Sequence, residues 1–406
     1  MIFTTLGTLH FRHFALLGGV VAVPDWIWFV FIFAFGCCIG SFLNVVIYRL
    51  PRDKSLITPP SACPACGKHI RFYDNIPLIS WLLLGRKCRY CKAPVSLRYF
   101  VIELLTGLVF LGLFILYFRT DLRTGMPSFL DGGWFIYLLH IILLAAFIAA
   151  SAIDLELWVI PLSICWFVTA VGLVGSALGG YIIGPDKVSG LPLFPGASAG
   201  TGSLAAGAVI GLAISWVLLA TGLIKRSYES ADSQNSPDKP EKLTEQQFNH
   251  RLEVCREIIF LLPIILCSLA AYWIGRKSSL IQSLDFSQHP VIAGLLGSLW
   301  GYFVGCGIVW ATRIFGTLTF GKEAMGLGDV HLMGAAGAVI GPIFVVVAFF
   351  IAPFFGLAWA GFQMFFKKTR QIPYGPFLSL GILAVMILHD WIYSLIIDYL
   401  LFSIYY

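Results

Sequence analysis

The stretch GWFIYLLHIILLAAFIAASAID, from Gly133 to Asp154, is apolar over almost its whole length and ends in a carboxylate. A helix of about 20 apolar residues spans the hydrocarbon core of a bilayer, so the stretch predicts a membrane helix. Charged side chains are costly inside a membrane, and those that occur there are candidates for function. The carboxylate at the end of this predicted helix is therefore a candidate functional group.

The same apolar pattern recurs along the whole chain. Of its 406 residues, 58% are hydrophobic and 12% are charged, a composition typical of polytopic membrane proteins and not of soluble domains. The sequence therefore predicts an all-α polytopic membrane protein of about ten helices. The expected helices cover residues 26–48, 98–118, 133–153, 161–183, 203–224, 258–275, 290–312, 329–341, 342–366 and 377–403.

The positions of Lys and Arg predict the orientation. Most of them fall in segments 49–97, 225–257, 313–328 and 367–370, and basic residues near helix ends are retained in the cytoplasm. Both chain ends are therefore expected outside. Membrane topology explains the net charge of +6, so no nucleic-acid partner is expected.

Four cysteines lie in the first basic segment as two C-x-x-C pairs, Cys63 with Cys66 and Cys88 with Cys91. Two such pairs can place four thiolates around one tetrahedral Zn²⁺. Such a closed site has no free coordination position, so the predicted zinc is structural. A redox-active dithiol is the alternative.

Asp154 and Asp329 are the two carboxylates expected at the membrane boundary, at the same depth. Asp154 begins an Asp-x5-Ile-Pro turn, and Asp329 follows Gly326 and Gly328. Glycines at these two positions would let an extended peptide approach the second carboxylate. Each aspartate also has a simpler interpretation, because Asp329 can be a helix N-cap and Asp154 an ordinary interfacial residue.

Other polar residues in the helices are weaker candidates. His140, His389 and Asp390 are expected to be hydrogen-bond partners in helix packing, with the last two toward the outer leaflet. The minor site candidates are Glu103, Glu323 and His331.

Several motifs resemble those of the type IV prepilin peptidases, in the same order. They are GSFLNVVIYRLP (40–51), the cysteine pairs with NIPLISW between them, LRYFVIELLTG (97–107), IDLELWVIP (153–161), GKEAMGLGDV (321–330) and IPYGPFLSLG (372–381). The resemblance covers most of the chain except about 184–289. It differs at Leu162, where the family often has a second Asp, and at His331, where a Lys is usual.

The resemblance implies a GxGD-type membrane aspartic protease in which Asp154 and Asp329 are catalytic. The implied substrates are type IV prepilins or pseudopilins, whose basic leader is cleaved at the cytoplasmic face of the inner membrane. It also implies N-methylation of the new N-terminus with S-adenosylmethionine. The sequence has no Gly-rich nucleotide loop, so this second activity depends on the resemblance alone.

Five regions are expected. Residues 1–48 hold the N-terminal segment and first helix, 49–97 a cytoplasmic zinc-ribbon-like domain, and 98–183 the helices around Asp154. Residues 184–289 form an inserted helical hairpin outside the catalytic core, and 290–406 the GxGD region. The alternatives are an ion- or proton-coupled transporter with a regulatory zinc domain, or a membrane-anchored zinc ribbon that binds a partner. Transporters place their acidic site near the midplane of the bilayer, whereas both aspartates are expected at one boundary.

Overall fold

The structure is a computed structural model that describes residues 24–120, 122–183, 194–224, 250–278, 289–365 and 373–396. Within these ranges the regular elements are helices, and extended pairing is limited to two isolated bridges in the cysteine segment. The chain divides into two compact units, Met1–Val168 with Phe350–Tyr406, and Thr169–Phe349. Each unit is described by itself.

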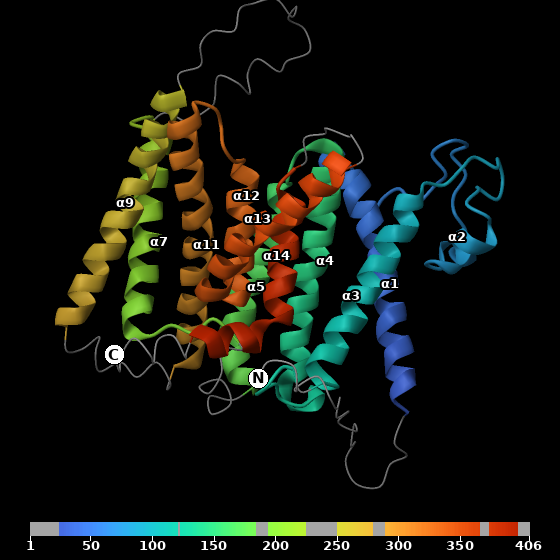
Figure 1. Cartoon of the computed structure of the whole chain (residues 1–406), viewed down its shortest axis with the longest axis horizontal. Helices are drawn as coiled ribbons and strands as arrows, with labels where there is room; N and C mark the ends of the chain where they lie inside the picture. Colours follow the sequence, from blue (N-terminus) through green and yellow to red (C-terminus); the bar gives the residue numbers. More distant parts are fainter. Residues whose placement is uncertain are drawn as a thin grey trace, which may run out of the picture. The chain divides into compact units, whose positions relative to one another are not determined.

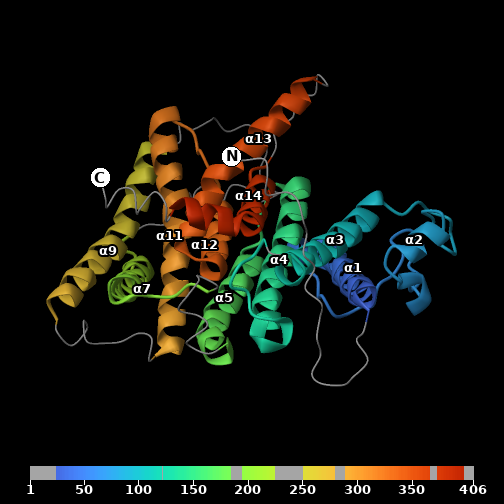
Figure 2. The ribbon, with the colours of Figure 1, turned by 60° about the horizontal axis from the view of Figure 1, so that its bottom comes forward.

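The first unit contains helices α1, α3, α4 and α14, which are labelled in Figure 1. Their bounds are Asp25–Arg49, Leu97–Phe118, Trp134–Leu157 and Gly375–Ile387. Helices α1 and α3 lie side by side in both ribbon views (Figures 1 and 2). A Cβ added at Gly40 would lie 2.7 Å from Cα of Glu103, and one at Gly36 would lie 2.9 Å from Cα of Gly107. This close contact requires glycine, as in the small-xxx-small motif of membrane helices.

The cysteine segment joins α1 to α3 and contains the short helix α2, Ile79–Leu83. Two single-turn helices accompany it, Leu50–Arg52 and Phe72–Asn75, and another turn, Phe129–Gly133, precedes α4. An ion pair between Arg98 and Glu156 joins the beginning of α3 to the end of α4. Asp154 therefore lies at the same end of this unit's helices as the cysteine segment.

The second unit contains α7 (Ala199–Ala220), α9 (His250–Lys277), α11 (Pro290–Phe320) and α12 (Leu327–Ile340). Glycines again permit close contacts. A Cβ added at Gly207 or Gly211 of α7 would lie 2.4 Å from a carbonyl oxygen of α9. Gly301 of α11 and Gly337 of α12 contact each other reciprocally, since an added Cβ on either would lie 2.0 or 2.1 Å from the other's carbonyl oxygen. The α11–α12 contact fixes the short helix that carries Asp329.

Helices α5 (Leu162–Ile183) and α13 (Pro342–Phe365) contain the residues at which the chain passes from one unit to the other. Among the described residues, eight helices are long and apolar enough to cross a membrane. A ninth span is formed if the bent pair Gly375–Ile387 and His389–Ile396 counts as one. These helices indicate a multi-pass membrane protein, and α12 is the expected shorter apolar helix.

The largest differences between the structure and the predicted helices are at three boundaries. The expected last helix, 377–403, breaks at Leu388 with a 76° bend, and its residues beyond 396 lie outside the described part. Helix α9 begins at His250 instead of 258, and α11 continues to Phe320 instead of ending at 312. The earlier beginning of α9 and the later end of α11 have one cause. Glu257 and Arg313 form a buried ion pair, so these two charged residues, expected outside the helices, lie within them.

The glycine contact between α11 and α12 leads to a stability prediction. Replacing Gly301 with Ala would force a methyl group against a backbone carbonyl, which cannot move aside as a side chain can. We expect a loss of about 1–3 kcal/mol, the usual cost of overpacking, and a lower thermal unfolding midpoint in detergent.

Gly307 lies on the same helix with no neighbouring atom within 4 Å of an added Cβ, so Gly307→Ala is the matched control. It should be neutral or stabilising by up to about 1 kcal/mol, from helix propensity. Equal midpoints for the two variants would show that the α11–α12 contact is looser than described.

Candidate functional site

Asp154 lies in the last turn of α4 and is buried, with 5% of its surface exposed. Its Oδ2 accepts a hydrogen bond of 3.1 Å from the backbone N–H of Gly375. Gly375 is the first residue of α14, where N–H groups have no partner within the helix and the helix dipole favours a negative charge. The beginning of α14 therefore stabilises a carboxylate at the end of α4.

Gly375 is a residue that the sequence interpretation did not identify as part of the site. A Cβ added there would lie 2.6 Å from Oδ2 of Asp154, so any side chain would displace the carboxylate. The Oγ of Ser379 donates to the carbonyl oxygen of Gly375 and receives a 2.8 Å hydrogen bond from Ser151 of α4. The glycine before Pro376, in the IPYGP motif, was the available signal.

Asp329 is the third residue of α12 and is buried, with 8% of its surface exposed. Gly326 occupies the N-cap position in an extended conformation, so the interpretation of Asp329 as the N-cap is wrong. A Cβ added at Gly326 would lie 3.5 Å from Oδ2 of Asp329, which shows that the carboxylate turns back toward this glycine. Gly328 lies within the first turn, directly before the aspartate. Asp329 belongs to the second unit and Asp154 to the first.

The three minor candidates have identifiable contacts. Glu103 is buried in α3 and accepts a 2.8 Å hydrogen bond from the backbone N–H of Leu78, in the cysteine segment. Nδ1 of His331 lies 3.3 Å from the hydroxyl of Tyr302, and Glu323 forms an ion pair with Arg313. Each of these residues thus joins two elements of its own unit.

The four predicted cysteines come together. Their sulfur atoms all lie within 4.8 Å of one another, and Sγ of Cys63 lies 3.8 Å from Sγ of Cys91. A tetrahedral site with Zn–S bonds of about 2.3 Å has sulfur–sulfur edges of about 3.8 Å. The cluster can therefore hold a metal ion, and its donor set and size fit zinc.

The two cysteine pairs have the same backbone geometry. The backbone N–H groups of Gly67 and Lys92 donate to the carbonyl oxygens of Cys63 and Cys88, respectively, four residues earlier. Both residues have a left-handed conformation, with φ of 67° and 59°. Backbone N–H groups of Cys91 and Tyr90 lower the pKa of the Cys88 thiol to about 6, because they stabilise the thiolate, the form that binds metal.

Three further polar residues of the first unit, His140, His389 and Asp390, lie toward the other end of α4. Asp390 accepts hydrogen bonds from the backbone N–H and the hydroxyl of Thr124 and lies 2.8 Å from Nδ1 of His389. Nδ1 of His140, which is buried, lies 2.6 Å from the hydroxyl of Tyr117. These contacts agree with the prediction that His140, His389 and Asp390 serve helix packing.

Two family models match separate parts of the chain. The bacterial peptidase A24 N-terminal domain matches residues 34–117, which include α1 from residue 34 onward, the cysteine segment and α3 up to its last residue but one. The type IV leader peptidase family matches residues 259–361, from within α9 to α13, and includes Asp329. No solved structure matches the chain.

Curated relatives carry corresponding names. The prepilin leader peptidase/N-methyltransferase of Myxococcus xanthus is 40% identical over 158 residues, which cover 39% of this chain and 42% of the relative. The protein of the same name from Aeromonas hydrophila is 33% identical over 189 residues, which cover 41% of this chain and 60% of the relative. The type 4 prepilin-like proteins leader peptide-processing enzyme of Escherichia coli O78:H11 is 26% identical over 371 residues. These residues cover 87% of this chain and 91% of the relative.

The matches to the first two relatives thus span about half of the relatives' length, whereas the third spans nearly all of it. Both family segments occur in one chain, in sequence order, and include the cysteine cluster and the Gly-x-Gly-Asp turn. The chain is thus similar to the type IV leader peptidase family in both matched segments.

Proposed function

We propose that this chain is a membrane aspartic endopeptidase that removes the basic leader from type IV prepilins or pseudopilins. Asp154 and Asp329 supply its two catalytic carboxylates. The observation that best supports the proposal is the position of Asp329: a buried carboxylate in the first turn of a helix, inside the segment that matches the type IV leader peptidase family. Asp154, buried in the last turn of α4 against the first N–H group of α14, is the second carboxylate.

Hydrolysis by two carboxylates requires that one accepts a proton from the attacking water while the other donates a proton to the peptide carbonyl oxygen or the leaving amine. The two carboxylates must therefore serve one scissile bond in the working enzyme. Two carboxylates that serve one bond share a proton in such a mechanism, because like charges at short distance cannot both ionise easily. The backbone N–H of Gly375 donates a hydrogen bond to the carboxylate of Asp154 and thereby orients it.

The proposal includes the location and the second activity. The catalytic end faces the cytoplasm at the inner membrane, where a basic leader stays in the cytoplasm and the apolar helix of the substrate lies in the bilayer. N-methylation is proposed from the names of the relatives, and S-adenosylmethionine is the methyl donor that the family resemblance implies. Zinc, held by the four cysteines, stabilises the fold of the segment between α1 and α3.

The aspartate proposal predicts the behaviour of three variants. Asp154→Asn and Asp329→Asn keep the shape of the side chain but remove its acid–base function, so each should lose nearly all cleavage of a co-expressed prepilin. The double variant should be scarcely worse, because residues of one catalytic unit have non-additive effects. Processing is followed by the gel shift of the prepilin.

Asp390→Asn is the control, because this carboxylate contacts Thr124 at the other end of α4. It should leave cleavage largely intact. Substantial cleavage by Asp329→Asn at normal protein level would refute the assignment, and ion uptake by the purified protein without cleavage would favour the transporter.

Gly375 provides a test of how Asp154 is positioned. Gly375→Ala places a methyl group where the carboxylate now lies, and a displacement of about 1 Å at a catalytic group can cost about 10²-fold in rate. Gly361→Ala is the control, since no atom lies within 4 Å of its added Cβ. Leader cleavage should fall for Gly375→Ala alone at equal protein level. Unchanged cleavage would show that Asp154 acts in another position.

The zinc proposal predicts one zinc ion per chain, lost in Cys66→Ser. A matched pair of variants tests the backbone geometry. No atom lies within 4 Å of an added Cβ at Gly67, so Gly67→Ala should lower the stability of the folded cysteine segment only by the energy of holding alanine in the left-handed conformation, about 1 kcal/mol. Lys92→Gly should raise the stability of the segment by a similar amount.

A difference of 1 kcal/mol is about fivefold in an equilibrium, so zinc transfer to a colorimetric chelator should be easier for Gly67→Ala and harder for Lys92→Gly. Iron in the purified protein would contradict the zinc proposal, and disulfides in place of metal would favour the redox-active dithiol.

A further inference from the structure

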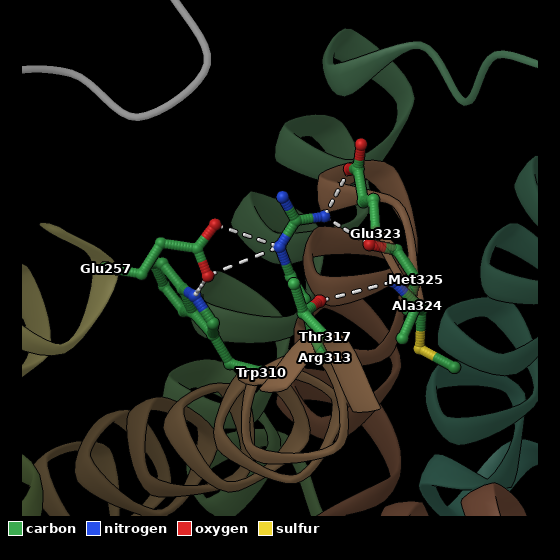
Figure 3. Close-up of polar contacts among 7 residues, drawn as sticks. All are labelled: Glu257, Trp310, Arg313, Thr317, Glu323, Ala324 and Met325. Carbon is green, nitrogen blue, oxygen red and sulfur yellow. Dashed lines mark hydrogen bonds and ion pairs between the residues drawn. The ribbon is translucent and has the colours of Figure 1, made fainter. Parts of the chain in front are cut away.

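Arg313 of α11 has a buried charge, with only 1% of its surface exposed. An ionised group buried in a protein needs charged or hydrogen-bonding partners, because its loss of hydration costs several kcal/mol. Figure 3 shows that this guanidinium lies between two carboxylates that come from different segments, Glu257 of α9 and Glu323 of the loop after α11.

On one side, Nε of Arg313 donates to the two carboxylate oxygens of Glu257 at 3.0 and 3.3 Å. Glu257 is 3% exposed, and its Oε2 also accepts a 3.0 Å hydrogen bond from the indole N–H of Trp310. The carboxylate is thus held by two side chains of α11, one turn apart. Glu257 in turn fixes the orientation of the guanidinium.

On the other side, Nη1 of Arg313 reaches the loop that leads to Asp329. It donates to Oε1 of Glu323 at 2.6 Å and to the backbone carbonyl of Met325 (Figure 3). A third bond joins the loop to α11, from the backbone N–H of Ala324 to the hydroxyl of Thr317 at 3.3 Å.

These contacts fix the beginning of α12. Met325 directly precedes Gly326, the N-cap of that helix, and Asp329 follows four residues after Met325. The left-handed Gly321 ends α11, so the chain must return over Arg313 before α12 begins. A guanidinium can hold Glu257, Glu323 and the Met325 carbonyl at once because its donors point in fixed directions in one plane.

We infer that Arg313 is a positioning residue for Asp329: clamped by Glu257 of α9, it holds the 321–325 loop and thereby the first turn of α12. The inference rests on the proposed function. The sequence predicts that the hairpin of α7 and α9 is accessory, but through Glu257 this hairpin also helps to position Asp329. The ion pair between Arg313 and Glu257 therefore does more than stabilise the fold.

The test uses the full chain in detergent with a synthetic prepilin peptide, and measures kcat, KM and the thermal unfolding midpoint. Arg313→Lys keeps the charge but cannot reach Glu257 and Met325 together. We expect kcat to fall about 10²-fold, since Asp329 is no longer held in place, while KM changes little. Glu323→Gln, at a half-exposed position, should fold normally and lose about tenfold in kcat, the value of one charged hydrogen bond.

Arg256→Lys is the matched control, because Arg256 of α9 forms an ion pair with Glu253 one turn away. It should keep the kcat of the unaltered protein. A kcat of Arg313→Lys or Glu323→Gln equal to that of the unaltered protein would overturn the inference. A fall in kcat that is fully explained by a lower thermal unfolding midpoint would also overturn it. If Arg313→Lys does not fold, Glu323→Gln alone decides. Failure of the proposed function is distinguishable, since the unaltered protein would then not cleave the peptide.

Discussion

The cost of burying charge in an apolar, helical protein is the constraint on which the rest of this structure depends. Arg119, at the end of α3, is 1% exposed and lies 2.6 Å from Asp25 at the beginning of α1. Arg313 is compensated in the same way by Glu257 and Glu323. Such pairs give little net stability, but removing one partner leaves an uncompensated charge. They therefore specify which helices lie together, and in which register.

Close contact between helix backbones is the second constraint on this structure. The proposed site depends on it as much as the fold does. The glycines that let α1 meet α3, and α11 meet α12, leave no space for a side chain. At Gly375 the same absence of a Cβ admits a carboxylate, so that Asp154 reaches the N–H group at the beginning of α14. A substitution that is conservative for helix formation would thus act directly on the proposed chemistry.

Most of the helices could be predicted from the sequence because apolar length alone determines a membrane span. The cysteine cluster was predictable because the ligand spacing is local. The beginning of α9 and the end of α11 could not be predicted, because charged residues in a sequence favour a loop and the partner of Arg313, Glu257, lies 56 residues away. The break at Leu388 was missed for a similar reason: Asp390 bonds Thr124, which is 266 residues distant. The role of Gly375 also required the structure.

Whether Asp154 and Asp329 serve one peptide bond can be measured directly with a photoreactive substrate. A prepilin peptide with a diazirine side chain next to the scissile bond is bound to Asp329→Asn protein, irradiated, and the adducts are mapped by mass spectrometry. Adducts both near residues 154–160 and near residues 321–330 are expected, and excess unlabelled prepilin peptide should abolish both. Adducts confined to one of these segments would contradict a shared catalytic site.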